Sequence, residues 1–275
     1  MMPERLVLAC REQVQIDPQT ERVDFEPMSE RVNYPLWHRA VEITAIAAYL
    51  AILIVVLHHL FAHAMWSDPA AFAWAFSAVF AGLVAADFVS GFVHWAADSF
   101  GTPEWPFLGR AYIKPFRDHH DDPKGITHHD FVEVNGNNCV TILLFLPFVA
   151  AAHALLPEPA QLWLLGWTAA FTVAVFFTNQ IHSWAHADSV PAFVAVLQRH
   201  HIILSPKSHD LHHTPPHSSY FCITFGWLNP LLARTDFFGR LSDGLEGYAR
   251  TLLLAAAGCG PSRSRIAESA RCRAA

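Results

Sequence analysis

The sequence predicts an all-α integral membrane protein, with four transmembrane helices and a helical, histidine-rich cap on the cytosolic side. Three observations support this fold class. Hydrophobic residues make up 53% of the 275 residues and charged residues only 15%, whereas roughly 25% of a typical soluble domain is charged. Four apolar stretches are each long enough to cross a bilayer, which takes about 20 helical residues. No Lys or Arg lies within residues 40–109 or 125–198.

The chain divides by composition into an arm, a membrane domain and a tail. Residues 1–40 are polar and mixed in charge, without the apolar core of a signal peptide, and we interpret them as a flexible cytosolic arm. The membrane domain is predicted over residues 41–245. Its four predicted spans are residues 42–65, 71–95, 139–157 and 160–183. Residues 246–275 are rich in small residues and Arg, and we expect a disordered tail.

The positions of Lys and Arg predict the orientation. The short connections at 67–69 and 157–159 carry no positive charge. Because Lys and Arg collect in cytoplasmic loops, both termini and the 96–138 loop are expected in the cytoplasm. The Ala- and Leu-rich composition is typical of a bacterial source, which predicts the cell membrane, or the endoplasmic reticulum for a eukaryotic chain. The net charge of -6 argues against nucleic acid as a partner.

Histidine is unusually abundant, with 18 residues. In the predicted topology most of them fall at the cytosolic boundary, at the ends of the second and fourth spans and in the segments that follow. The clustered residues are His94, His119, His120, His182, His186, His209, His212 and His213. The motif HDLHH (209–213) would place three imidazoles on one side of a helix. His58, His59 and His63 fall at the opposite end of the first span, where we expect a structural role.

This concentration of imidazoles predicts a metal centre. Imidazole suits iron, zinc and copper, whereas magnesium and calcium prefer oxygen ligands. A structural zinc takes four ligands, and about eight to eleven candidates share one face here, which indicates two metal ions. Two irons with mostly histidine ligands at a membrane surface suit O2 activation and C–H oxidation. Nearby carboxylates could bind a metal or orient a histidine N–H; they are Asp98, Asp118, Asp121, Asp130 and Glu133.

Beyond the spacing, the chain resembles the lipid desaturase family of histidine-box membrane enzymes, which includes plasmanylethanolamine desaturases. The resemblance covers about residues 85–240. The matching segments are DFVSGFVHWAADSFG (87–101), KPFRDHHDDP (114–123), ITHHDFVEVNGNN (126–138), TNQIHSWAH (178–186), HHIILSPKSHDLHH (200–213) and HSSYFCITFGWLN (217–229).

The resemblance implies a catalytic diiron centre with no separate nucleophile, and O2 as co-substrate. The implied metal ligands are His94, His119, His120, His129, His182, His186, His201, His209, His212, His213 and His217. The implied reaction introduces the vinyl-ether double bond into the sn-1 alkyl chain of an ether phospholipid, which converts plasmanylethanolamine to plasmenylethanolamine. Because the sequence carries no flavin or nicotinamide fingerprint, electrons must come from an external one-electron donor of the ferredoxin or cytochrome b5 type.

Two classes of alternative remain open at this point. An acyl-lipid (fatty acid) desaturase or a hydroxylase of the same family would keep the same site and differ in its product. A histidine-rich metal-binding or haem-binding membrane protein would not be an enzyme at all. A metal transporter should carry its ligands in the middle of the membrane. A haem would need one axial pair, such as His94 with His182, and would leave the other histidines unexplained.

Overall fold

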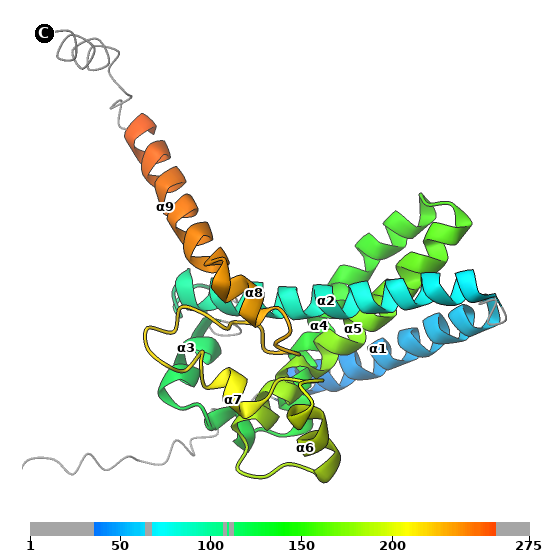
Figure 1. The fold of residues 1–275 in the computed structure, drawn as a ribbon, viewed down its shortest axis with the longest axis horizontal. Coiled ribbons are helices and arrows are strands. Elements are labelled where there is room, and N and C mark those ends of the chain that lie inside the picture. The colour runs from blue at the N-terminus through cyan, green and yellow to red at the C-terminus, as the bar shows by residue number, and fades with distance from the viewer. Residues whose placement is uncertain (1–35, 64–67, 107–108, 110–112, 257–275) are drawn as a thin grey trace, which may run out of the picture. The chain divides into compact units, whose positions relative to one another are not determined.

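The computed structural model describes residues 36–63, 68–106, 109 and 113–256. Every regular element in these residues is a helix, which confirms the all-α prediction for this part of the chain (Figure 1). In chain order the elements are α1 (Leu36–His63), α2 (Pro69–Ser99), α3 (Lys114–Asp121), η3 (Gly125–His128), α4 (Phe131–Ala154), α5 (Glu158–His186), α6 (Ala192–Arg199), α7 (Pro206–His209), α8 (Asn229–Arg234) and α9 (Phe237–Ala256).

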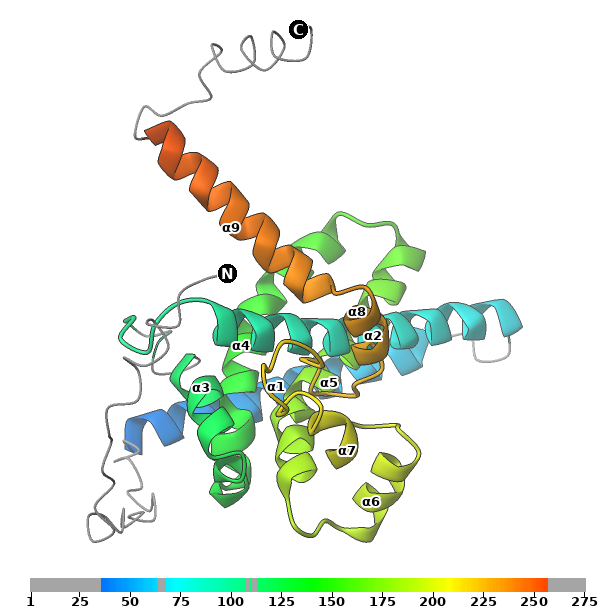
Figure 2. The same ribbon diagram turned by 60° about the vertical axis from the view of Figure 1, so that its left-hand side comes forward.

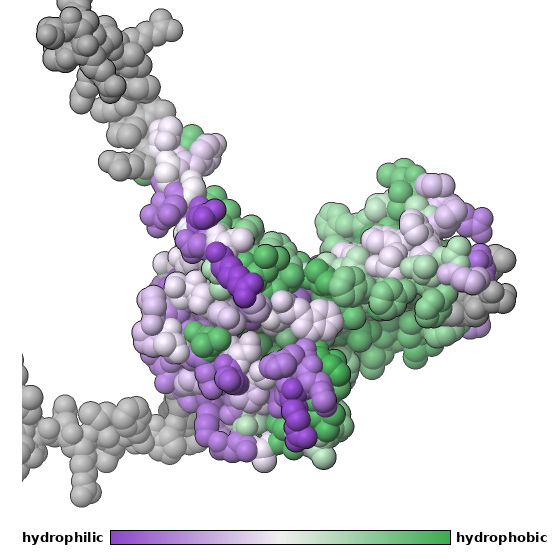
Figure 3. Space-filling view, in the orientation of Figure 1, coloured by the Kyte–Doolittle hydropathy of each residue, from purple (hydrophilic) through white to green (hydrophobic). Residues whose placement is uncertain are grey.

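Four helices, α1, α2, α4 and α5, are long and apolar enough to cross a membrane, as the sequence predicts. Large apolar side chains on them point outward, where a lipid bilayer would cover them; Phe76 is 63% exposed and Phe148 73%. Figure 3 shows a continuous hydrophobic surface over these helices and hydrophilic residues over α3, α6 and α7. The chain is thus a multi-pass membrane protein.

The helices extend beyond the predicted spans, and at α4 the cap rather than hydropathy decides where the helix begins. The α4 helix begins at Phe131, eight residues before the predicted span at 139, because Asp130 and Glu133 form a capping box. Asparagines in its first turns bond within α4 and to α5, so that this polar segment remains helical; Asn138 Nδ2 donates to the Val175 carbonyl at 2.9 Å. The α9 helix likewise continues to Ala256, within the predicted tail. The predicted arm up to residue 35 and the tail from 257 lie outside the described residues.

The membrane helices pack through small residues and one buried hydroxyl pair. The α2 helix runs along α5, and α5 along α4 (Figure 2). At Gly82 a Cβ would lie 2.5 Å from the Trp167 carbonyl oxygen, so only glycine allows α2 and α5 to approach this closely. The α1 helix joins α4 and α5 through an apolar cluster around Tyr49, whose hydroxyl lies 3.3 Å from that of Thr172.

Beyond one end of α2 and α5 lies the cap, which we define as α3, η3, α6, α7 and the loop 210–228 (Figure 1). An apolar core attaches it to the end of α5; that core consists of Ile181, Ala185, Val194, Ile203, Leu204 and Ile223. The apolar stretch 191–204 forms α6 and part of this core.

A buried carboxylate attaches the last part of the cap to α2. Asp87 is fully buried, and its Oδ1 accepts backbone N–H bonds from Phe225 and Gly226, both at 2.8 Å, while Oδ2 accepts one from Leu228 at 3.0 Å. Ser90, one turn along α2, accepts from the Ile223 N–H at 3.1 Å. The 221–232 stretch is therefore held against α2 by its own backbone.

Candidate metal centre

The clustered histidines form two groups whose potential ligand atoms lie within 4.8 Å of one another. The all-histidine group consists of His119, His182, His186, His209 and His213. The carboxylate-containing group consists of His94, Asp98, His120 and His212. Both groups lie where the ends of α2 and α5 meet the cap, which brings together residues far apart in the sequence.

The two long helices contribute their ligand candidates as i, i+4 pairs. His94 and Asp98 project from the last turns of α2, and His182 and His186 from the last turns of α5. The pairing predicted from the sequence is thus present, and each pair belongs to one group.

The α3 and HDLHH segments divide their histidines between the groups. His119 and His120 are neighbours on α3, and each belongs to a different group. The α7 helix ends at His209, and the chain continues as a turn in which the N–H groups of His212 and His213 bond to the His209 carbonyl. His209 and His213 then join the all-histidine group while His212 joins the other. Because the helix ends at His209, His212 and His213 leave a turn and not a continuous helix face, so the three histidines of HDLHH do not serve one site as the sequence suggested.

In the all-histidine group, ring nitrogens converge closely. The Nε2 atom of His209 lies 2.8 Å from that of His182 and 3.1 Å from that of His213. The Nε2 atoms of His119 and His186 are buried and have no hydrogen-bond partner within the part of the chain that the structure describes. Buried nitrogens without partners are costly, and a cation among them would satisfy all of these lone pairs. The residues present therefore fit a bound metal ion.

In the carboxylate-containing group, three imidazoles surround one carboxylate oxygen. Asp98 Oδ2 lies 3.0 Å from Nε2 of His120, 3.4 Å from that of His94 and 3.6 Å from that of His212. The Nδ1 atoms of His94 and His212 lie 3.1 and 2.9 Å from the backbone carbonyls of Phe221 and Ser219. A carbonyl accepts only, so these bonds place the proton on Nδ1 and leave the Nε2 lone pairs free for a metal.

Burial keeps four of the cap histidines neutral. Burial, followed by the neighbouring imidazoles, lowers the pKa of His119 to about 2. Burial likewise lowers the pKa of His212 to about 3 and of His213 to about 4, and it holds the pKa of His209 well below its usual value. A pKa below neutrality means that the imidazole carries no proton on its ligand nitrogen at neutral pH. Neutral imidazole is the form that binds metals.

Three predicted histidine ligands lie outside both groups. His217 adjoins the carboxylate-containing group, with its ring 4.7 Å from that of His120, but its Nδ1 lies 3.1 Å from the His212 carbonyl. The His129 side chain is 60% exposed, and its Nδ1 lies 3.2 Å from a Glu133 carboxylate oxygen. His201 is exposed, in a left-handed turn with φ of 54°. We leave these three out of the ligand sets proposed below.

Four of the predicted carboxylates also lie elsewhere. Asp130 and Glu133 cap α4, and Asp130 makes an ion pair with Arg39 at 2.7 Å. This ion pair and the cap hold the pKa of Asp130 below its usual range. Asp118 pairs with Lys114 on α3, and Asp121 is an exposed residue at the end of that helix. Asp98 is the carboxylate that the structure brings to the histidines.

The sequence analysis missed the groups that orient the histidines. Asp87 holds the loop whose Phe221 carbonyl contacts His94. Its signal was available, because a carboxylate within a membrane span is costly and is usually functional. The roles of the Phe221 and Ser219 carbonyls could not be predicted from the sequence, because every residue has a backbone carbonyl.

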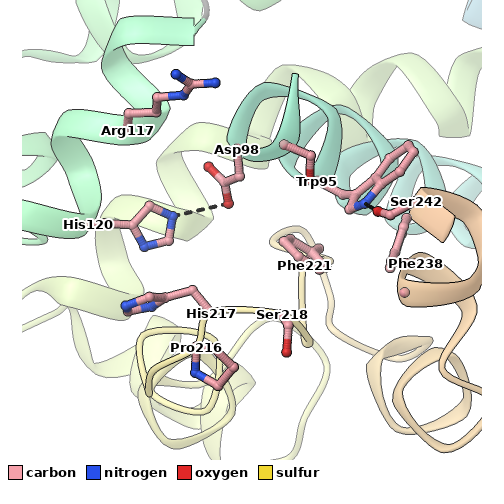
Figure 4. Close-up of a pocket in the computed structure, with 12 residues that line it drawn as sticks. Trp95, Asp98, Arg117, His120, Pro216, His217, Ser218, Phe221, Phe238 and Ser242 are labelled. Carbon is pink, nitrogen blue, oxygen red and sulfur yellow. Dashed lines mark hydrogen bonds and ion pairs between the residues drawn. The ribbon is translucent and has the colours of Figure 1, made fainter. Parts of the chain in front are cut away.

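A cavity of about 360 Å³ lies beside the carboxylate-containing group (Figure 4). Asp98 and His120 form part of its wall, whereas no member of the all-histidine group lines it. Pockets of this size bind small molecules or parts of larger ones. A molecule in this cavity would therefore meet the carboxylate-containing group first.

The fold and the site together define a membrane protein with a histidine cluster that fits a bound metal, and comparison with known families places it in a family of membrane enzymes. The family model of the lipid desaturase domain matches residues 83–251, more than half of the chain, so the chain belongs to the lipid desaturase family. This match begins just before Asp87 and contains all residues of both groups.

Several curated relatives have been named by activity. The chain is 48% identical over 205 residues to "Plasmanylethanolamine desaturase" of Myxococcus xanthus, covering 73% of this chain and 69% of that protein. It is 47% identical over 174 residues to "Plasmanylethanolamine desaturase 1" of Mus musculus, covering 62% of this chain and 64% of that protein, slightly less than two thirds of its length. "Fatty acid desaturase 4, chloroplastic" of Arabidopsis thaliana is 30% identical over 165 residues, covering 59% of this chain and 49% of that protein. No solved structure matches the chain.

Proposed function

We propose that this protein is an O2-dependent lipid desaturase that introduces the vinyl-ether double bond into the sn-1 alkyl chain of ether phospholipids, from plasmanylethanolamine to plasmenylethanolamine. The observation that carries the proposal is the pair of adjacent ligand groups at the ends of α2 and α5. The plasmanylethanolamine desaturase activity named for relatives at 48% and 47% identity supports the choice of reaction.

The proposed cofactor is two iron ions, one in each group. Imidazole donors with a single carboxylate suit iron. A purely structural role for these histidines would not explain why several of their buried nitrogens have no hydrogen-bond partner among the described residues. When bound, the irons supply O2 activation and the oxidation of C–H bonds. The balanced reaction removes one hydrogen from each of the first two carbons of the alkyl ether chain; O2, two electrons and two protons are consumed, and two molecules of water are released.

The protein's own residues orient ligands and shape the space for the chain. The Phe221 and Ser219 carbonyls hold the imidazoles of His94 and His212 with Nε2 toward Asp98. Aromatic side chains, including Trp95, line the cavity beside this carboxylate. The carbons that react are next to the lipid headgroup, which suits a site at the end of the membrane helices.

Electrons must come from another protein, because the sequence carries no flavin or nicotinamide fingerprint. We propose a ferredoxin or cytochrome b5-type donor on the cytoplasmic side. With that orientation both termini and the cap are cytoplasmic, in the bacterial cell membrane or in the endoplasmic reticulum of a eukaryotic cell. Residues 41–245 are the proposed catalytic domain.

The second candidate is an acyl-lipid desaturase, which the chloroplastic fatty acid desaturase 4 relative favours. Its site would be the same, and the double bond would lie in an ester-linked chain. Haem binding is less suitable, because two axial ligands would leave most members of the two groups without a role.

Lipid mass spectrometry tests the proposal. The chain is expressed in a plasmalogen-free host that is fed an alkylglycerol and contains a competent electron donor. Ether phospholipids lighter by two hydrogens should appear, and mild acid should release an aldehyde from them, because a vinyl ether is acid-labile. An acid-stable double bond would instead support the acyl-lipid desaturase.

Two variants link the product to the site. Replacing His182 with Ala should abolish product formation, since its Nε2 is central to the all-histidine group. Replacing His58 with Ala is the matched control, because this exposed histidine lies near the end of α1 outside both groups. Normal turnover in His182→Ala would refute the metal assignment.

A further inference from the structure

The cavity beside the carboxylate-containing group has one polar wall and one aromatic wall. Figure 4 shows Arg117, Asp98 and His120 on one side, and Trp95 with Phe238 on the other. The lining residues are Trp95, Asp98, Ser99, Arg117, His120, Pro216, His217, Ser218, Phe221, Phe238, Gly239 and Ser242. A ligand that fills this space should therefore be amphipathic, with a charged part and an apolar part.

Arg117 is the only Lys or Arg in that lining, and its guanidinium is partly uncommitted. Its Nη2 donates to the carbonyls of Gly101 at 2.9 Å and Phe100 at 3.3 Å, which caps the end of α2. Its Nε is buried and has no hydrogen-bond partner among the described residues. An arginine has five N–H donors, so the cap explains only part of this side chain. A buried charged donor without an acceptor is costly, which indicates that a ligand supplies one.

The cap function by itself does not explain this placement. A cation at a helix C-terminus is stabilised by the helix dipole wherever it lies around the axis. Here the same guanidinium also lines a cavity that Asp98 and His120 share. Glu104 and Asp98 are two carboxylates that interact with it electrostatically. Glu104 does not line the cavity, and Asp98 faces three imidazoles, so neither fills the acceptor position within the cavity.

We infer that Arg117 binds the phosphate of the lipid substrate, which places the first carbons of the alkyl chain beside the carboxylate-containing group. Guanidinium matches phosphate oxygens in charge and in planar geometry. The aromatic wall at Trp95 and Phe238 suits the first methylene groups. In an ether phospholipid only the glycerol unit separates the phosphate from the ether oxygen, so one small cavity accommodates both. This inference rests on the proposed function.

The position of Arg117 on α3 makes it a positioning residue as well as a binding residue. It lies three residues before His120, so both side chains leave the same face of one short helix. The distance between bound phosphate and metal centre is thus set within a single rigid element. A lipid without phosphate would lack the contact with Arg117. The position of its alkyl chain relative to the carboxylate-containing group would then not be fixed.

Binding of three probes to the purified full-length protein in detergent tests the inference without turnover. The first probe is a short-chain ether glycerophospholipid, the second is the same ether glycerol lipid without phosphate, and the third is inorganic phosphate. Affinities are taken from the rise in unfolding temperature with ligand concentration. The phospholipid should bind about tenfold to hundredfold more tightly than the phosphate-free lipid, as expected for a charged hydrogen-bonded contact. Inorganic phosphate alone should bind far more weakly.

Arg117→Gln should remove the difference between the two lipids and leave affinity for the phosphate-free lipid unchanged. Lys114→Gln is the matched control on α3, because Lys114 is exposed, pairs with Asp118 and does not line the cavity. If Arg117→Gln unfolds, Ser218→Glu is the second variant, since it places a carboxylate at an exposed position of the cavity wall and leaves the α2 cap intact. It should weaken binding of the phospholipid only.

Three outcomes would overturn the inference: equal affinity of the wild type for both lipids, a preserved difference in Arg117→Gln (or in Ser218→Glu where Arg117→Gln does not fold), or inorganic phosphate binding as tightly as the phospholipid. The last result would indicate a general anion site. Failure of the proposed function looks different, because phosphate-dependent binding would persist while the mass-spectrometry assay gave no acid-labile product. Product formation together with equal affinities would refute this inference alone.

Discussion

The Asp87 carboxylate offers a sharp test of how the cap is held on the membrane helices. It accepts three backbone N–H bonds, two on Oδ1 and one on Oδ2. In Asp87→Asn the remaining oxygen retains two of them, while the new amide directs its own N–H groups at the Leu228 N–H. One buried donor is then unsatisfied, and the other two bonds lose their charge.

The expected cost follows from these bonds. An unsatisfied buried donor costs about 1–3 kcal/mol, and each charged bond that becomes neutral loses about 1 kcal/mol. Removal of a buried charge from the membrane helix offsets part of this loss. We therefore expect destabilisation of about 2–4 kcal/mol. The loop would also release the Phe221 carbonyl from His94, so that metal bound by the carboxylate-containing group should be lost first.

Thermal unfolding and metal analysis of the purified protein measure both effects. Asp87→Asn should lower the unfolding temperature by several degrees and reduce the bound metal toward one ion per chain. Asp243→Asn, an exposed carboxylate on α9, is the control and should change neither quantity. An Asp87→Asn protein with the unfolding temperature and metal content of the wild type would refute the argument that this carboxylate holds the cap.

Three further predictions concern the site and its support. Asp98→Asn should weaken metal binding in the carboxylate-containing group, and His182→Ala should weaken it in the all-histidine group. Elemental analysis should therefore find about one metal ion in each single variant. Loss of both ions in either variant would show that the groups do not bind metal independently. Gly91→Ala should destabilise the protein by about 1–3 kcal/mol, because the added Cβ would lie 2.6 Å from the Cys222 Sγ, and a denaturation midpoint equal to that of the wild type would contradict this close contact. His129→Ala should retain the full metal content, since the side chain is 60% exposed and outside both groups, and a lost ion would return this residue to the ligand set.

The membrane helices were predictable from the sequence because their signal is local. A run of apolar residues indicates a span wherever the rest of the chain lies. The ends were less predictable, because a cap is decided by a few hydrogen bonds. At α4 the Asp130–Glu133 capping box starts the helix in a segment whose hydropathy is polar. The asparagines that follow are tolerated because α5 accepts their amide hydrogens.

The ligand candidates were predictable as a set, and their division between two groups was not. The i, i+4 spacing of His182 and His186 depends only on the helix that carries them. Adjacent residues such as His119 and His120 point in different directions, and the sequence does not specify what lies on either side. That assignment depends on the tertiary packing of α3 against the end of α2, which the spacing does not encode.

The division has a chemical consequence for how the two sites are related. One short helix, α3, supplies a ligand candidate to each group, and the turn after α7 does the same. A displacement of either segment would therefore alter both groups together. The Asp87 anchor acts further along the chain, since it binds the backbone of residues 225–228, close to the Phe221 carbonyl that contacts His94. Its loss should affect the carboxylate-containing group first, and that group is the one beside the cavity. Asp87 thus fixes the cap to the membrane helix and also supports the proposed ligand group beside the cavity, which gives this carboxylate a role that offsets the cost of placing it in an apolar span.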